Sequence, residues 1–552
     1  MSQDIYEKII TISKRKGFFY PSFEIYGGSA GFYSYGPLGS RLKQNLEKKF
    51  REFYLLKEDC LEINTPNINL YEILEASGHV EKFTDLTVDC KKCNQSYKAE
   101  DLYEEEIPVK EAIKKEMVKC PQCGKILENP YPVNLMFSTE IGIGNTRKAF
   151  LRPETAQGIF TGFHLLYRYG REKLPLGVIQ IGEGYRNEVS PRQGIIRLRE
   201  FSMAEAEIFF DPENKKHPSF LEVKDDKVKL FDNENEIELT LNEAVNKGVI
   251  NNQALAYYMN LTQKFLMHIG INPDKFRFRK HAEDELAHYA QECWDAEIYS
   301  ERFGWIECVG IADRSAYDLT SHIEKTGIDM HAMRKFETPR KHKIKKIEPN
   351  MGILGPKFKD AAGEIKKKLE KKDPEKIKGK EEIKITVKGK EYTIKKEAYD
   401  IVETEEKQFG EKYIPHVIEP SYGMDRIFYC LLEHSYHETT KEGEEYHLLK
   451  FKPEIAPIKA GVFPLIKDEG LIEIAKKIDK NLRNNKINTA YDESGSIGRR
   501  YARMDEIGTP YCITVDHTTL EDDTVTIRDR DTTRQERIKI KDIVQHLKEK
   551  IE

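Results

Sequence analysis

The spacing of apolar positions changes several times along the chain, and each change predicts a different kind of element. Residues 38–57 repeat apolar side chains every three or four positions, which predicts an amphipathic helix. From residue 150 to residue 210 the pattern instead favours strands, punctuated by glycine and arginine. Beyond residue 455, strand-like runs alternate with amphipathic stretches, which predicts a small α/β domain. Strands are expected at 461–465, 509–515 and 524–530, and helices at 471–485 and 543–551.

A lysine-rich stretch interrupts this pattern between residues 340 and 396. It holds 20 Lys and Arg against 9 Asp and Glu, and its apolar content is low until two short strand-like runs on either side of Gly389. The composition therefore predicts an exposed insertion that contains a β-hairpin.

Composition narrows the class of protein. The chain has 552 residues, enough for roughly three to five domains, and 89 Lys and Arg against 94 Asp and Glu give a net charge of −5. This balance argues against a protein that coats nucleic acid over its whole surface. No apolar run approaches the ~18–20 residues of a membrane span, and the N-terminal segment lacks an apolar core followed by a cleavage site. With most of its cysteines scattered, the chain is expected to be a soluble protein of the reducing cytoplasm.

Four of the nine cysteines form two Cys-x-x-Cys pairs, Cys90 with Cys93 and Cys120 with Cys123, separated by 26 residues. Two such knuckles complete the tetrahedron of thiolates that zinc prefers, although the spacing is a little longer than usual. No histidine lies beside them, so the expected site is structural. The alternative is two unrelated pairs of buried thiols.

Arginine and glutamate are concentrated in residues 184–207. Arg186 closes one expected strand, and Arg197 and Arg199 are expected on one face of the returning strand, opposite Leu198. Guanidinium groups that converge on a hairpin suit a polyphosphate, because they pair with two phosphate oxygens at once. The alternative is a surface hairpin with ordinary ion pairs.

Two further stretches favour the anion-binding interpretation. Arg426 lies in the first turn of an otherwise apolar helix, where burial is costly unless an anion meets it. Glu154 lies two positions after Arg152 at an expected strand-to-helix turn.

These stretches carry a family resemblance. YRNEVSPRQG with REFSMAEAE (185–207) and EPSYGMDR (419–426) resemble motifs 2 and 3 of class II aminoacyl-tRNA synthetases, and the helix at 38–57 resembles motif 1. With LRPETAQGIF (151–160) and GWIECVGIADRSAYDLTSH (304–322), they are similar to glycyl-tRNA synthetases of the homodimeric archaeal and eukaryotic type. The resemblance covers nearly the whole chain.

The resemblance implies an α+β fold: a six-stranded antiparallel catalytic sheet flanked by helices, with a zinc-binding insertion and a C-terminal α/β anticodon-binding domain. The boundaries expected are 1–89, 124–335 and 406–454 for the catalytic domain, 90–123 for the zinc-binding insertion, 336–405 for the basic insertion and 455–552 for the anticodon-binding domain.

The resemblance also implies roles for individual residues. Arg186 would contact the α-phosphate of ATP, Arg426 would grip the γ-phosphate, and these two are the expected catalytic residues. Phe201 would stack on the adenine, and Glu307 would bind Mg²⁺. The full set expected at ATP is Arg186, Asn187, Glu188, Arg197, Leu198, Phe201, Glu307, Cys308 and Arg426.

For glycine, the resemblance places Glu154, Glu205 and Glu419 around the ammonium group, with Ser421 close to the α-carbon. Pro420 completes the expected glycine-binding set. A single methyl group is worth only ~1–3 kcal/mol in a pocket that can accommodate it. Alanine is therefore expected to be rejected by steric blockage, and Ser421 is the expected obstacle.

The implied activity is ligation of glycine to glycine tRNA through glycyl-adenylate, by a cytoplasmic homodimer. Two other interpretations stay open: a non-catalytic nucleic-acid-binding subunit on the same scaffold, and a class II synthetase for serine, threonine, proline or histidine. The basic insertion is either a solvated lysine-rich surface or a contact for the tRNA acceptor stem. Arg499, Arg500 and Arg503 are either phosphate or base contacts or a solvated helix face.

Overall fold

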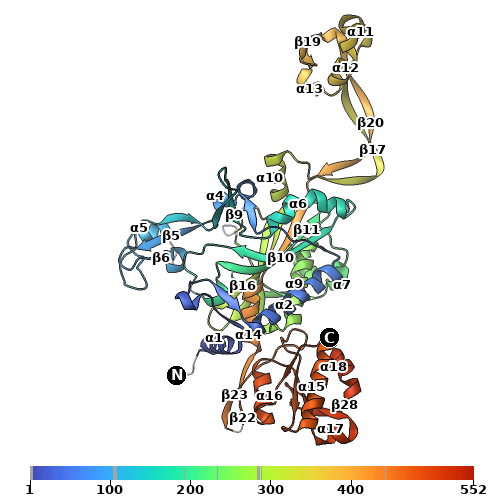
Figure 1. Ribbon diagram of the computed structural model, residues 1–552. Helices are drawn as coiled ribbons and strands as arrows, with labels where there is room; N and C mark the ends of the chain where they lie inside the picture. Colours follow the sequence, from blue (N-terminus) through green and yellow to red (C-terminus); the bar gives the residue numbers. More distant parts are fainter. Residues whose placement is uncertain are drawn as a thin grey trace. The chain divides into compact units, whose positions relative to one another are not determined.

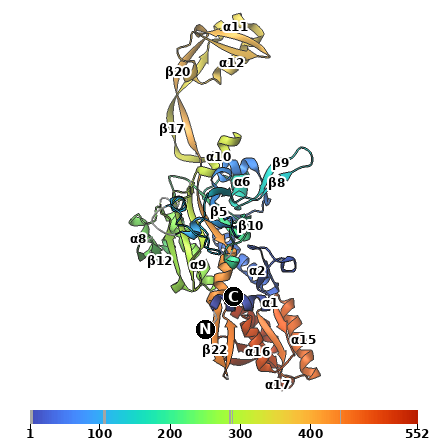
Figure 2. The ribbon, with the colours of Figure 1, turned by 90° about the vertical axis from the view of Figure 1, so that its left-hand side faces the viewer.

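The structure, a computed structural model, describes residues 4–103, 108–191, 193–232, 234–282, 286–287, 289–441 and 443–551. The chain forms two compact units, one of residues 1–330 and 414–552 and one of residues 331–413 (Figures 1 and 2). Among the described residues, no helix has the length and apolar character needed to cross a membrane.

The first unit contains a nine-stranded sheet in the order β13-β12-β14-β15-β16-β21-β11-β10-β3. Its six central strands are antiparallel throughout, as expected. The sheet is nevertheless larger than expected and mixed, because β3 and β12 each join an edge by parallel pairing. The strands are β13 (Glu236–Thr240), β12 (Lys227–Phe231), β14 (Phe276–Lys280), β15 (Glu292–Ser300), β16 (Gly304–Ser315), β21 (His416–Gly423), β11 (Glu200–Phe210), β10 (Leu176–Tyr185) and β3 (Leu61–Glu62).

Strand β11 shows how the sequence divides the two faces of this sheet. Its small and apolar residues Ala204, Ala206 and Ile208 join the main core, which also holds residues of α2 (Pro37–Arg51), α9 (Gln253–Ile269) and α14 (Met424–Ser435). The alternate residues point to the other face, where Phe209 packs on two phenylalanines of α6 (Ala156–Tyr169). Glu205 has the same parity as Phe209, so the period of two places its carboxylate on the α6 side.

Two helix predictions have different outcomes. The helix expected at 38–57 is confirmed: α2 runs on into a π-helical segment, Glu52–Lys57. The strand-like pattern from 150 to 210 is interrupted by α6, which begins just after the strand-to-helix turn expected at Glu154 but extends further than that turn indicated. There, Ile159, Phe163 and Tyr167 recur at helical spacing and are buried.

The region with the two cysteine pairs forms a small module of its own, called here the four-cysteine module (residues 84–103 and 108–134). Its sheet has the order β6-β5-β7, built from β5 (Thr84–Cys90), β6 (Gln95–Lys98) and β7 (Tyr131–Asn134). Val88, Tyr97 and Ala112 belong to a separate small apolar cluster beneath it.

The C-terminal part of the first unit is the expected α/β domain. Its sheet has the order β25-β24-β26-β27-β28, with parallel pairing on both sides of β24. The predicted strands and helices are all present, and they lie at β24 (Ala460–Pro464), β26 (Tyr511–Val515), β27 (Thr524–Asp529), α15 (Glu469–Asn484) and α18 (Ile543–Ile551). The domain also contains β25 (Thr489–Tyr491), β28 (Gln535–Lys539), α16 (Ile497–Glu506), α17 (His517–Asp522) and a 3-10 turn at Ile540–Asp542.

The second unit is drawn in yellow and gold in Figure 1. A long antiparallel ribbon of β17 (Ala332–Pro349) and β20 (Tyr399–Tyr413) leads to α11 (Met351–Phe358), α12 (Ala362–Glu370), α13 (Pro374–Ile377) and a hairpin. The hairpin expected around Gly389 is confirmed as β18 (Glu382–Val387) and β19 (Lys390–Lys395). The ribbon pairs part of its positive charge across the strands, as in Lys341–Glu405.

Candidate active site

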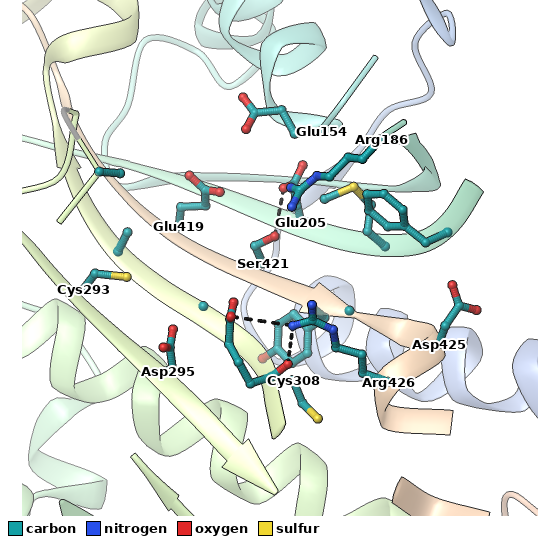
Figure 3. A pocket seen from close by; sticks show the side chains of 18 of the residues that line it. Glu154, Arg186, Glu205, Cys293, Asp295, Cys308, Glu419, Ser421, Asp425 and Arg426 are labelled. Atoms are coloured by element: carbon teal, nitrogen blue, oxygen red, sulfur yellow. Dashed lines mark hydrogen bonds and ion pairs between the residues drawn. The ribbon is translucent and has the colours of Figure 1, made fainter. Parts of the chain in front are cut away.

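A cavity of about 500 Å³ lies over strands β11, β16 and β21 (Figure 3). Every residue expected at glycine or ATP lines it except Asn187 and Pro420. Asn187 instead donates its backbone N–H to the Leu135 carbonyl, 2.7 Å away. Pro420 is buried on β21, opposite Ile311 of β16.

Strand register places Glu205 beside Ser421. The two residues are paired across β11 and β21, and the Ser421 hydroxyl donates to Glu205 Oε1 at 2.8 Å. The other carboxylate oxygen, Oε2, accepts from the backbone N–H of Thr155 at 2.7 Å and from the Thr155 hydroxyl. Burial and the neighbouring Glu154 raise the pKa of Glu205. On β16, Gly310 lies opposite Ser421 and faces open space, which leaves room beside the hydroxyl.

Glu154 is held as an anion at the N-terminal end of α6. Its Oε1 accepts from Gln157 Nε2 at 2.9 Å, and its Oε2 lies 3.4 Å from His79 Nε2. Burial acts to raise the pKa of Glu154, but His79 and Arg314 outweigh it, so the pKa is lowered.

Arg314 is the central cation of this carboxylate group. Its side chain is 1% exposed, donates to Asp318 at 2.9 Å and to Glu419, and has Nη2 3.8 Å from Glu154 Oε1. Its guanidinium also lies 3.8 Å from the centre of the Tyr289 ring. Burial raises the pKa of Glu419 to about 8, although Arg314 opposes the rise.

Glu207 adds a further carboxyl group to the same face of β11. It is fully buried, and neither oxygen has a hydrogen-bond partner among the described residues. Burial and then Glu419 raise its pKa well above the usual value. Because an unpaired carboxylate is costly in such a place, Glu207 is expected to carry a proton.

The arginines after β10 depart from the expected hairpin. The returning strand begins at Glu200, because a 3-10 turn at Gly194–Ile196 precedes it, so Arg197 and Arg199 lie before the strand. Arg186 lies between two rings, 5.3 Å from the centre of Phe83 and 5.2 Å from that of Phe201.

The two arginines of the returning segment have separate partners. Arg197 lines the cavity and forms an ion pair with Asp101 at 2.8 Å. Arg199 donates to the carbonyls of Glu188 and Ala30, which is a structural role. Burial raises the pKa of Glu188, although Arg186 and Arg197 oppose the rise.

Arg426 lies on the opposite side of the cavity, at the start of α14. It donates to the backbone carbonyls of Ile196 at 3.2 Å and Glu307 at 2.6 Å, and lies 3.6 Å from a carboxylate oxygen of Glu307. That carboxylate is half exposed. Cys308 lines the cavity, but its Sγ lies 3.8 Å from the Sγ of Cys430 in α14.

Several lining residues had no separate signal in the sequence. His79 and Phe83 come from a short segment before the four-cysteine module, and Asp425 lies one residue before Arg426. Arg314 was present in the quoted segment GIADRS, and its spacing of four from Asp318 is the signal that could have identified the pair.

Comparison with known proteins agrees with this geometry. Residues 137–435 match the family model "tRNA synthetase class II core domain (G, H, P, S and T)", and residues 455–550 match "Anticodon binding domain". The glycine–tRNA ligase of Methanocaldococcus jannaschii is 49% identical, with 100% of both chains covered. That of Pyrococcus horikoshii is 48% identical over 99% of each chain.

This chain belongs to the glycine–tRNA ligase family. It has the class II synthetase core of that family with a large mixed sheet, followed by an α/β anticodon-binding domain. A crystal structure of prolyl-tRNA synthetase from Cryptosporidium parvum, complexed with L-proline and AMP, shares the fold. Its TM-score is 0.51 at 12% identity, covering 98% of this chain and 75% of that one.

The expected four-cysteine cluster is present in this glycine–tRNA ligase. The Sγ atoms of Cys90, Cys93, Cys120 and Cys123 all lie within 4.8 Å of one another. The Sγ atom of Cys90 lies 3.5 Å from that of Cys123, and the Sγ atom of Cys93 lies 3.5 Å from that of Cys120. Each cysteine of one pair therefore lies next to a cysteine of the other pair. Four thiols in this arrangement fit a tetrahedral zinc ion.

The sequence left open whether the arginines of α16 contact nucleic acid or form a solvated helix face, and the structure shows that they differ from one another. Arg500 is buried and donates to the backbone carbonyls of Pro464 and Leu465, so it is a structural residue. Arg503 is paired with Asp492. Arg499 is exposed on the same helix.

Proposed function

We propose that the cavity performs both steps of glycine ligation. The carboxylate of glycine would attack the α-phosphate of ATP, giving glycyl-adenylate and releasing pyrophosphate. The glycyl group would then pass to the terminal adenosine of glycine tRNA. The observation that carries this proposal is the placement of a buried carboxylate cluster next to two arginines in one cavity.

The carboxylate side of the cavity suits an ammonium group. Glu154, Glu205 and Glu419 are buried together, and Arg314 is the central cation among them. A substrate ammonium would supply the positive charge that the cluster lacks. Ser421 is proposed to lie against the α-carbon of glycine, where Pro420 fixes the backbone of β21, so that a larger side chain is excluded.

The arginine side suits the triphosphate. We assign Arg186 to the α-phosphate and Arg426 to the γ-phosphate, since they lie across the cavity from each other (Figure 3). Phe201 would exchange its contact with Arg186 for the adenine ring, and Asn187, Glu188, Arg197, Leu198 and Cys308 would complete the nucleotide site.

The half-exposed carboxylate of Glu307 suits a hard cation and would hold Mg²⁺. The bound ion would neutralise charge on the phosphates.

The protein needs no general base for the first step. The carboxylate of glycine is already ionised at neutral pH, so the residues of this chain have to position the two substrates and stabilise developing charge on the phosphate. Arg186 is proposed to do both, because it lines the cavity and keeps the Phe83 ring 5.3 Å from its guanidinium when Phe201 turns to the adenine.

Three further features belong to this proposal. We propose a structural zinc ion in the four-cysteine module and a cytoplasmic location. We also propose a homodimer, in which a second copy covers the exposed apolar residues near the N-terminus. Phe23, Ile25, Tyr26 and Leu56 are 56–89% exposed and are the residues that the second copy would cover.

Glycine-dependent exchange between ATP and pyrophosphate tests the proposal. The assay is run without tRNA, with alanine and serine beside glycine. We expect exchange with glycine alone and expect Glu419→Gln to raise the KM for glycine while the KM for ATP changes little. Exchange with none of the three amino acids would contradict the proposed adenylation and favour another specificity or a non-catalytic role.

A further inference from the structure

The four-cysteine module and the residues that flank it contact the nucleotide side of the cavity at three separate positions. Phe83, the residue before β5, lies under the guanidinium of Arg186 at 5.3 Å. Leu135, the residue after β7, accepts the backbone N–H of Asn187 at 2.7 Å. Asp101, which follows β6, pairs with Arg197 at 2.8 Å.

These contacts have a common origin in the small sheet. Strands β5 and β7 are paired, with Thr84 opposite Asn134, so the two ends that meet the cavity are held side by side. The N–H of Leu135 also donates to the carbonyl of Phe83 at 3.1 Å, which joins them directly. At the far end of β5 lies Cys90, the first of the four clustered cysteines.

The third contact is made by the turn that follows β6. Asp101 lies eight residues after Cys93 in a 3-10 turn, Glu100–Leu102, whose start is fixed by a hydrogen bond from the Ala99 N–H to the Leu86 carbonyl, at 2.8 Å. The pair with Arg197 is partly exposed, with side chains 25% and 40% accessible. The Asp101 carboxylate therefore holds a flexible arginine at the rim of the cavity without burying it.

We propose that Asp101 is a positioning residue for ATP: the four-cysteine module holds Arg197, Arg186 and Asn187 in place, and Asp101 is its charged contact. This inference deepens the proposed function and rests on the assignment of those residues to the nucleotide. A preordered arginine loses less conformational freedom when a phosphate binds, so the module acts on the affinity for ATP. Asp101 is not one of the described residues that line the carboxylate side of the cavity, so its replacement should leave the affinity for glycine unchanged.

Asp101→Asn is the direct test, with Asp101→Glu as the conservative variant and Glu100→Gln as the matched control at a neighbouring exposed carboxylate. In the exchange assay we expect Asp101→Asn to raise the KM for ATP about two- to five-fold, the range for a partly exposed ion pair. The kcat and the KM for glycine should stay unchanged. Asp101→Glu should restore most of the ATP affinity, and Glu100→Gln should match the wild type.

A second readout does not depend on turnover. Binding of ATP to the whole protein, measured by calorimetry, should weaken by the same factor in Asp101→Asn. It should also weaken after zinc has been removed by a chelator and Mg²⁺ has been restored, while glycine binding is retained.

Three outcomes would overturn the inference. One is an ATP affinity equal to wild type in Asp101→Asn. Another is a tighter one, which would show that Asp101 competes with phosphate for Arg197. The third is a parallel loss of kcat and of affinity for both substrates, which would show general structural damage. Failure of the proposed function is seen separately, as an absence of glycine-dependent exchange in the wild type.

Discussion

At the scale of single residues, the site depends on one buried guanidinium. Arg314 donates to Asp318 and Glu419 and lies close to Glu154, so it neutralises part of a cluster that would otherwise repel itself. Removing one partner of a buried ion pair leaves the others uncompensated, which costs more than the pair itself contributes.

Arg314→Met is therefore expected to destabilise the protein by about 3–5 kcal/mol, the range for breaking a buried ion pair. Urea unfolding followed by tryptophan fluorescence measures the loss, because Trp294 lies in the core of the same sheet. Arg168→Met on the exposed side of α6 is the control and should have little effect. A loss as small as that of the control would mean that the carboxyl groups are all protonated in the wild type.

The pKa of Glu419 gives a pH prediction. Burial raises it to about 8, and an ammonium group binds the ionised form. The KM for glycine should therefore fall as pH rises from about 6.5 to about 8.5, because a larger fraction of Glu419 is ionised before glycine binds. Steady-state exchange kinetics across that range measure the effect, with the KM for ATP as internal control. A KM for glycine that rises or stays flat would contradict it.

At the scale of elements, the sequence predicted what its local periods could show. The alternation in β11 and the helical period of α2 each lie within one segment, so both were visible. The start of α6 was expected from the turn at Glu154, but its extent was not, because its pattern was averaged with the strands on either side. Strand β3 has only two residues, too few for a period, and it joins the sheet through pairing with β10, far along the chain.

The residues of the cavity show the same difference between what one segment reveals and what only the fold brings together. Motif residues on β11, β21 and α14 could be assigned because their neighbours resemble a known family. His79, Phe83 and Asp101 could not, because each is a single residue whose partner is distant in sequence and is brought to it by the fold of the four-cysteine module and its flanking residues.

The four-cysteine module gives a prediction at this scale. We expect one zinc ion per chain, and its removal should speed amide hydrogen exchange in residues 85–125 before the rest of the catalytic domain. Cys120→Ser should reduce the zinc content, whereas Cys512→Ser, at a buried thiol of the C-terminal domain, should keep it. Elemental analysis and mass-spectrometric exchange measure both. Equal zinc in the two variants would place the ion elsewhere.

At the scale of the whole molecule, composition identified an inserted region but could not show which of its lysines form ion pairs. The 20 Lys and Arg of residues 340–396 stand out in the sequence, yet Lys341, Lys346 and Lys384 pair with glutamates across strands. Such pairing depends on register, which composition does not contain.

Replacing residues 341–407 by an Asn-Gly turn tests the role of the second unit, because Arg340 and Gln408 are paired directly. We expect the variant to keep glycine-dependent exchange and to show a shallower salt dependence of tRNA binding, since phosphate contacts from lysines are lost. Filter binding at several salt concentrations measures the slope. An unchanged slope would identify the lysines as a solvated surface.

The same ribbon has a consequence for how such a chain can change over generations. Its first and last residue pairs, Ala332 with Tyr413 and Pro349 with Tyr399, join the outgoing and returning strands at both ends, and the register shifts once, between Lys335 and Arg340. A change in the gene that removes or adds one residue in each strand would shorten or lengthen the ribbon. Ser421 and Arg426, which come later in the chain, would keep their places in the fold. Lineages can therefore vary this segment in size while the chemistry of the enzyme is inherited intact.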